Sequence, residues 1–188
     1  NYADAYYNLG KIFRKLNMYK EAEISFRKLV SIKPDYENAN NDLGTILIKL
    51  LNLKEAEKYF RRECNFYPDS IVAYNNLGNV LIDLNKLEEA EKLLRKAIEI
   101  NPSIDETKYN FSLLLLKTKR FEEGWKKYEN RKQARGMRKS IVQELKVSIP
   151  EWTPDKRGKV LLWSEQGIGD QILFSSLIPE LAEKVDNL

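Results

Sequence analysis

The chain contains no histidine and a single cysteine, Cys64, among its 188 residues. Disulfides and thiol zinc sites each need more than one cysteine, and histidine is the side chain that most often exchanges protons near neutral pH. The sequence therefore excludes these kinds of site, and any catalysis would depend on carboxylates, lysines or tyrosines. We expect neither a metal site nor a bound cofactor.

Long apolar runs are also lacking. The longest, around residues 45–53, is broken by Lys49 and Asn52 and is too short to span a bilayer. The first residues show no basic segment followed by an apolar core, as a signal peptide would. With 43% hydrophobic and 32% charged residues, the composition is that of a folded chain. We therefore expect a cytoplasmic location and no membrane partner.

The formal net charge of +4 is unevenly distributed. Residues 117–139 hold ten Lys or Arg and three Glu. A solvated helical face is the simpler interpretation of this basic stretch. An acidic or phosphate-bearing partner is the alternative, and nucleic acid is the least favoured, because no aromatic-rich strand module accompanies the charge.

An internal repeat organises most of the chain, with a spacing of 34 residues. Asn8-Leu9-Gly10 recurs as Asp42-Leu43-Gly44 and Asn76-Leu77-Gly78. Three further columns keep the same register: an alanine, an aromatic or leucine, and a proline. They are Ala22, Ala56 and Ala90, then Phe26, Phe60 and Leu94, then Pro34, Pro68 and Pro102. The order predicts a helix, a short turn and a second helix in each repeat.

These columns resemble the tetratricopeptide repeat over residues 3–104. The resemblance implies an all-α fold, a right-handed superhelix of helical hairpins. We expect the superhelix to cover residues 1–136, with repeats at about 3–36, 37–70 and 71–104 and a degenerate fourth at 105–136. The fourth has Ser112 and Gly124 at the small positions and no closing proline. A deviant terminal repeat is expected where a solenoid is capped or meets another domain.

Helical packing predicts the core and the helix ends. In the first hairpin the core is expected to contain Leu9, Phe13, Tyr19, Ala22 and Phe26. The residue after each proline, Asp35, Asp69 or Ser103, is a candidate cap for the following helix. Ser103 and Glu106 have the spacing of a reciprocal capping box.

The first helices of stacked hairpins are expected to line a concave surface that binds a protein or peptide. Amides are frequent at the positions that face it, and amides can hydrogen-bond the backbone of an extended peptide whatever its sequence. The candidate binding residues are Tyr7, Asn8, Lys11, Asn41, Asn75, Asn76, Asn79, Tyr109 and Asn110.

The file of Asn8, Asn76 and Asn110, interrupted by Asp42, resembles the asparagine ladder of O-linked N-acetylglucosamine transferases, which implies a grip on substrate polypeptides. The alternative is that these amides bond neighbouring groups or water. Tyr7 and Tyr109 are candidate anchors, and packing against their own hairpins is the equally favoured alternative.

A second pattern begins after the repeats. Residues 137–157 are expected to form a capping helix and a linker that ends near Pro150 and Pro154. Residues 158–188 then read as a buried strand, a tight glycine turn at Gln166-Gly167-Ile168-Gly169-Asp170, and an apolar-periodic helix. This order predicts the start of a truncated Rossmann-like lobe, although a third glycine is missing from the dinucleotide-binding pattern.

Residues 120–188 resemble bacterial proteins that join tetratricopeptide repeats to a heptosyltransferase-like glycosyltransferase domain of two Rossmann-like lobes. Gly124-Trp125, Pro150-Glu151-Trp152 and the loop around Gly169-Asp170 carry the resemblance. It implies that Asp170 is the catalytic base of a longer parent, with Gln166, Gly167 and Gly169 shaping the loop. The simpler alternative is that Asp170 only caps the following helix.

The leading hypothesis is a protein-interaction module that forms the amino-terminal part of a glycosyltransferase-like protein. The resemblance implies that a nucleotide sugar binds mainly to the second lobe, so residues 1–188 are expected to be catalytically inactive by themselves. Two rivals are a non-catalytic scaffold for complex assembly and an anionic-ligand or nucleic-acid site in the basic stretch 117–139.

Overall fold

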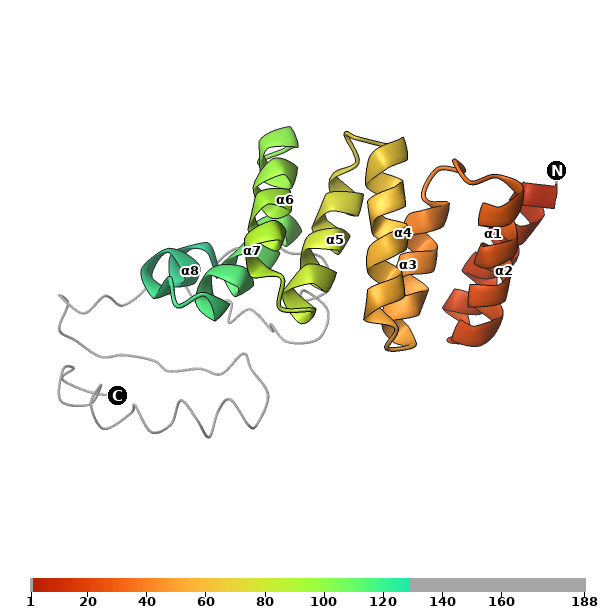
Figure 1. The fold of residues 1–188 in the computed structure, drawn as a ribbon, viewed down its shortest axis with the longest axis horizontal. Helices are drawn as coiled ribbons and strands as arrows, with labels where there is room; N and C mark the ends of the chain where they lie inside the picture. Colours follow the sequence, from red (N-terminus) through yellow and green to blue (C-terminus); the bar gives the residue numbers. More distant parts are fainter. Residues whose placement is uncertain (1, 129–188) are drawn as a thin grey trace, which may run out of the picture. The chain divides into compact units, whose positions relative to one another are not determined.

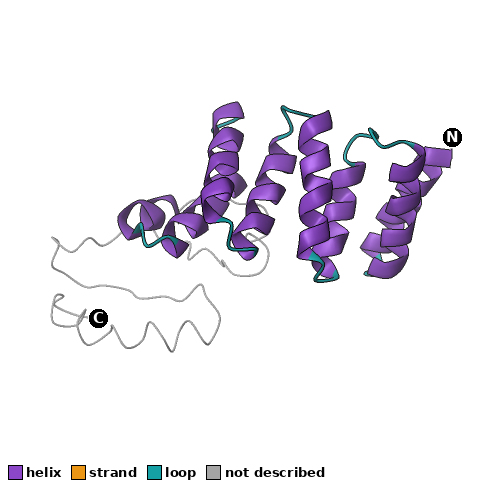
Figure 2. Ribbon diagram, in the orientation of Figure 1, coloured by secondary structure: helices purple, strands orange, loops and turns teal. Residues whose placement is uncertain are grey.

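The computed structural model describes residues 2–128, which form eight α-helices joined by short turns (Figures 1 and 2). None of these described helices is long and apolar enough to cross a membrane. The helices are α1 (Tyr2–Lys15), α2 (Tyr19–Ile32), α3 (Ala39–Lys49), α4 (Leu53–Phe66), α5 (Ile71–Asp83), α6 (Leu87–Ile100), α7 (Asp105–Lys117) and α8 (Phe121–Tyr128).

Consecutive helices pair into four hairpins, α1–α2, α3–α4, α5–α6 and α7–α8. The second helix of each of the first three hairpins also packs against the first helix of the next, so the hairpins stack in chain order (Figure 1). This all-helical repeated fold confirms the prediction made from the 34-residue spacing. The predicted linker and the strand, turn and helix of residues 158–188 lie outside the described residues.

A close contact inside each of the first three hairpins explains the glycine column. A Cβ added to Gly44 would lie 2.7 Å from a ring carbon of Phe60, and one added to Gly78 would lie 2.7 Å from Leu94. Real Cβ atoms do not approach other atoms so closely. The first helix can therefore pack directly on the large core side chain of the second because its glycine has no side chain.

Each hairpin turns through one residue in the left-handed conformation, again at 34-residue spacing. These residues are Asn17, Leu51, Asn85 and Lys119, with φ between 59° and 63°. Asparagine adopts this conformation at little cost, whereas leucine does not. The Leu51 side chain is 87% exposed, so it gains no burial in return.

Ion pairs join the second helices of neighbouring repeats. Arg27 of α2 binds Glu23 in its own helix at 2.8 Å and Glu55 of α4 at 2.7 Å. One repeat later, Arg61 binds Glu57 at 2.7 Å and Glu89 of α6 at 2.6 Å. We call this series the arginine ladder.

The arginine ladder shifts the ionisation of its carboxyl groups. The hydrogen bond from Arg27 lowers the pKa of Glu55 below its usual value, and the bond from Arg61 does the same for Glu89. Both carboxylates are therefore charged at neutral pH, as an arginine partner requires. Because these pairs are partly exposed, each contributes only modestly to the free energy of unfolding.

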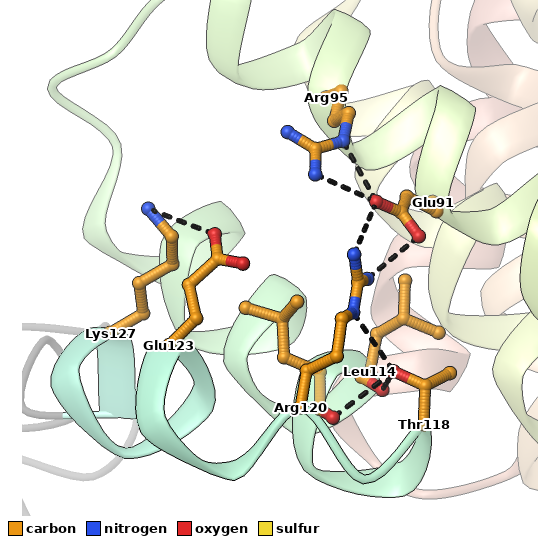
Figure 3. Close-up of polar contacts among 8 residues, drawn as sticks. Glu91, Arg95, Leu114, Thr118, Arg120, Glu123 and Lys127 are labelled. Carbon is orange, nitrogen blue, oxygen red and sulfur yellow. Dashed lines mark hydrogen bonds and ion pairs between the residues drawn. The ribbon is translucent and has the colours of Figure 1, made fainter.

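The last described junction uses a different arginine (Figure 3). Arg120, at the start of the fourth hairpin's second helix, reaches back to both carboxylate oxygens of Glu91, at 3.0 and 2.7 Å. Arg95 binds the same carboxylate at 2.7 Å. Glu123, the position equivalent to Glu55 and Glu89, instead lies 3.9 Å from Lys127.

Burial confirms most of the predicted first-hairpin core but not Leu9. Ala22 and Phe26 are fully buried, and Phe13 and Tyr19 pack against the core. The prediction for Leu9 was wrong, because its side chain is 40% exposed. Its counterpart Leu43 is buried because a preceding hairpin covers it, whereas no described helix precedes α1.

The predicted caps were also wrong, because the helices begin later than the residue after the proline. The side chain of Ser70, not Asp69, accepts the backbone N–H of Ala73 at the start of α5. No side chain caps α7 from its N-cap position, and the hydroxyl of Ser103 donates to Asn101 at 2.6 Å instead. Asp35 likewise lies before the Asn38 N-cap of α3.

The left-handed residue in the turn of each hairpin leads to a stability prediction. Replacing Leu51 with Asn should stabilise the protein by about 0.5–1 kcal/mol, because asparagine tolerates the left-handed conformation and the exposed leucine side chain contributes no packing. The reciprocal change Asn85→Leu should destabilise it by a similar amount. Urea unfolding of both variants measures the effect, and a loss of stability in Leu51→Asn would contradict it.

Candidate functional site

The candidate binding residues lie on the first helices α1, α3, α5 and α7, and we call their shared side the first-helix face. The structure places them there with different exposures. Asn8 and Lys11 are exposed, Tyr7, Asn76, Asn79 and Tyr109 are half-buried, and Asn41, Asn75 and Asn110 are buried.

The amides of this face are bonded to one another across successive repeats. The side-chain Nδ2 of Asn76 donates to Oδ1 of Asn41 at 2.8 Å. One repeat later, Nδ2 of Asn110 donates to Oδ1 of Asn75 at 2.9 Å. Each bond joins residues 35 apart, so the amides run diagonally across the face rather than in the 34-residue file that the sequence suggests. We call these bonds the amide pairs.

At the first junction, between α1 and α3, the residues in contact are also 35 apart but are not amides. The Tyr7 hydroxyl lies beside the carboxylate of Asp42, which is again 35 residues away. Arg14 of α1 also donates to Asp42 and forms an ion pair with it. The ammonium of Lys11 lies 5.1 Å from the centre of the Tyr7 ring. A carboxylate therefore replaces the amide at position 42, because it accepts a hydrogen bond from Arg14.

Burial dominates the electrostatics of this cluster. Only 7% of Asp42 is exposed, and loss of solvent raises the pKa of its carboxyl despite the opposing effect of Arg14 and Lys11. The pKa of the Tyr7 hydroxyl is raised by burial and then by the nearby Asp42. The Tyr7 hydroxyl therefore stays protonated at neutral pH beside Asp42.

Both candidate aromatic anchors contact other rings. The Tyr7 ring lies 5.0 Å from Tyr36 and meets Phe26 edge-on at 6.2 Å. The Tyr109 ring lies 5.6 Å from Tyr128, which itself meets Trp125 edge-on at 5.3 Å. These contacts hold the two tyrosines in place and leave part of each on the first-helix face.

Pairing does not exhaust the hydrogen-bonding capacity of the amides. A side-chain amide has two N–H donors and an oxygen with two lone pairs. Asn76 uses one donor on Asn41, and it remains half-exposed with its other donor and its oxygen. Each pair fixes the orientation of its amides, so the free groups are presented at set positions.

A buried carboxyl that the sequence analysis missed lies beside this face. Glu63 of α4 is 1% exposed, and its oxygens accept the backbone N–H groups of Asn38 at 2.8 Å and Asn41 at 3.3 Å. It therefore supplies the cap that α3 lacks from its own N-cap residue. Burial raises the pKa of Glu63, and burial also raises that of Cys64 to about 11. The Cys64 thiol is thus protonated and unreactive at neutral pH.

The remaining predicted residues divide into two groups. Asp170, Gln166, Gly167 and Gly169 lie outside the described residues, as do residues 129–139 of the basic stretch. In the described part of that stretch, Arg120 is bound to Glu91 and the ammonium of Lys117 donates to the carbonyl of Ile82 at 2.7 Å. No group of three or more potential metal ligands occurs among residues 2–128.

Two segments of the chain match known sequence families. Residues 3–36 and residues 71–104 each match a tetratricopeptide repeat family. These two segments are tetratricopeptide repeats. The two segments are the first and third hairpins, and the second hairpin between them keeps the same glycine contact and inter-repeat bonds. No curated protein matches the chain significantly.

Several solved structures share the fold. YrrB, described as having an unusual peptide-binding site, is 25% identical with a TM-score of 0.62 over 70% of this chain and 68% of its own. MamA from Desulfovibrio magneticus RS-1 is 18% identical with a TM-score of 0.64 over 70% and 74%. The first such domain of Spaghetti (RPAP3), bound to an HSP90 peptide, is 20% identical with a TM-score of 0.60 over 62% and 93%.

The hydrogen bond between Asn75 and Asn110 should be measurable as a coupling free energy in a double-mutant cycle. Asn75→Ala should cost about 1–2 kcal/mol of stability, because the buried Nδ2 of Asn110 then loses its acceptor. Asn110→Ala should cost much less stability in the Asn75→Ala variant than in the wild-type chain. Asn79→Ala, a half-buried amide on the same helix, is the matched control and should change stability by less than about 0.5 kcal/mol. Additive losses in the double variant would contradict the pairing.

Proposed function

We propose that the chain is a protein-interaction module that binds an extended polypeptide along its first-helix face. The amide pairs support this proposal most directly, because they hold Asn76 half-exposed on one side of the stack with an unused donor and an unused acceptor. The peptide-binding site named for YrrB and the peptide bound to Spaghetti (RPAP3) show that this type of fold can carry such a function.

An extended peptide presents alternating N–H and C=O groups, which match the donors and acceptors of a side-chain amide. Amides fixed by a neighbour lose less conformational freedom on binding than amides that move freely. The half-exposed Asn76 and Asn79 and the exposed Asn8 would contact the peptide backbone. The buried Asn41, Asn75 and Asn110 would support the contacting groups rather than touch the peptide themselves.

The proposal predicts a loss of peptide affinity when exposed amides are removed. Asn8→Ala combined with Asn79→Ala should weaken binding of a panel of unstructured polypeptides at least about fivefold, at one lost hydrogen bond of about 1 kcal/mol. Fluorescence anisotropy with the full 188-residue chain gives the dissociation constants.

The matched control places the same number of changes on the second helices. Lys58→Ala with Lys92→Ala removes two exposed side chains from α4 and α6 and should leave the affinity unchanged. Equal losses in both double variants, or no saturable binding by the wild-type chain, would contradict a peptide site on the first-helix face.

We further propose that this module is the amino-terminal part of a cytoplasmic glycosyltransferase-like protein, in which it presents the polypeptide to be modified. The sequence Gly167-Ile168-Gly169-Asp170 and its resemblance to that of heptosyltransferase-like domains favour this extension. The nucleotide sugar would bind only in the longer parent.

Release of free nucleotide from a panel of nucleotide sugars tests this extension. The untruncated parent should turn over at least one donor, and Asp170→Ala should abolish the turnover. No turnover with any donor by a folded parent would favour the rival, a non-catalytic scaffold. A third function, anion binding through residues 117–139, would instead appear as an affinity that falls steeply with salt concentration.

A further inference from the structure

An apolar stripe runs along the side of α1 that faces away from the rest of the stack. It consists of Ala5, Leu9, Ile12 and Leu16, at the i, i+4, i+7 and i+11 spacing of one helical face. All four residues are exposed, and Ile12 and Leu16 are 53% and 61% exposed. We call this surface the α1 stripe.

The other three repeats show what covers the same stripe. At the position of Leu9, the side chains of Leu43, Leu77 and Phe111 are at most 2% exposed. At the position of Ile12, Ile46, Val80 and Leu114 are fully buried. In each case the second helix of the preceding hairpin, α2, α4 or α6, packs against the first helix that carries them.

Two polar groups beside the α1 stripe also match an occupied junction. Glu21 is the equivalent of Glu55 and Glu89, which receive arginines from the preceding repeat 28 residues earlier. Asn8 is the equivalent of Asn76, which donates to the preceding Asn41 35 residues earlier. Both Asn8 and Glu21 are exposed, and within the described residues neither side chain has a hydrogen-bonding partner.

We infer that the α1 stripe is a docking surface for one further tetratricopeptide-type hairpin, whose second helix supplies an arginine to Glu21 and whose first helix supplies an amide to Asn8. The apolar stripe alone would fit many helices. The carboxylate and the amide, at distances along the chain that each recur in two of the three described junctions, specify a hairpin of this repeat type. Of the residues used here, only Asn8 also belongs to the first-helix face, and the apolar stripe and Glu21 do not depend on the proposed function.

The test supplies such a hairpin in register. A copy of residues 35–68 joined directly before Asn1 keeps the 34-residue period. It places its own Arg61 28 residues before Glu21 and its own Asn41 35 residues before Asn8. If the copy docks, the amide hydrogens of α1 should exchange at least about tenfold more slowly than in the unfused chain, and the Tm should rise by about 4 °C or more.

Variants on the stripe identify where the copy binds. Ile12→Asp in the fused chain should abolish the added protection of α1. Ile24→Asp should preserve it, because Ile24 is just as exposed but lies where the other repeats have lysine, at Lys58, Lys92 and Lys126. A copy that adds no helix by circular dichroism, or unchanged exchange in α1, would overturn the inference, since the same sequence folds as α3–α4 in its own place.

Sedimentation of the unfused chain tests whether a second copy of the chain, and not a further hairpin, covers the α1 stripe. The inference predicts that the chain shows no self-association through α1. A concentration-dependent dimer that Ile12→Asp dissolves and Ile24→Asp preserves would overturn it, by placing a second copy of the chain on the α1 stripe.

Discussion

The structure depends on the junction between one hairpin and the next, where a polar bond crosses from first helix to first helix. A helical hairpin cannot bury both of its faces alone, so each repeat is stable only against its neighbours. The hydrogen bonds of Asn76 to Asn41 and of Asn110 to Asn75, and the contact of Tyr7 with Asp42, occur at the same step of 35 residues. They connect each first helix to the one before it at a constant step along the chain.

The two sides of the stack use this regular step differently. On the second helices, Arg27 and Arg61 reach forward to carboxylates of the next repeat. On the first helices, neutral amides bond each other and keep part of their capacity. A surface of fixed, partly unsatisfied amides suits the backbone of an extended chain, whereas a surface of matched ion pairs does not.

Much of the fold follows from the sequence, because a 34-residue period with small, aromatic and proline columns predicts helix order and pairing directly. The 35-residue step could not be predicted in the same way, since it depends on the displacement between hairpins and shifts the amide contacts by one position. The exposure of Leu9 escaped the analysis for a related reason: its column is apolar in every repeat, and burial depends on having a preceding neighbour. Asn17 and Asn85 are residues typical of the left-handed conformation and could have indicated the turn positions. Leu51 and Lys119, at the same positions in the other repeats, are not typical of it.

Nuclear magnetic resonance of the side-chain amides offers the most direct test of the account that junction amides both order the stack and form the binding surface. With an unstructured polypeptide that the chain binds, the NH₂ signals of Asn8, Asn76 and Asn79 should shift in proportion to occupancy. The signals of Asn52 and Asn65, which lie at the start and in the last turn of α4, should stay unchanged. Shifts confined to the second helices, with the Asn76 signals unaffected at saturation, would contradict the account.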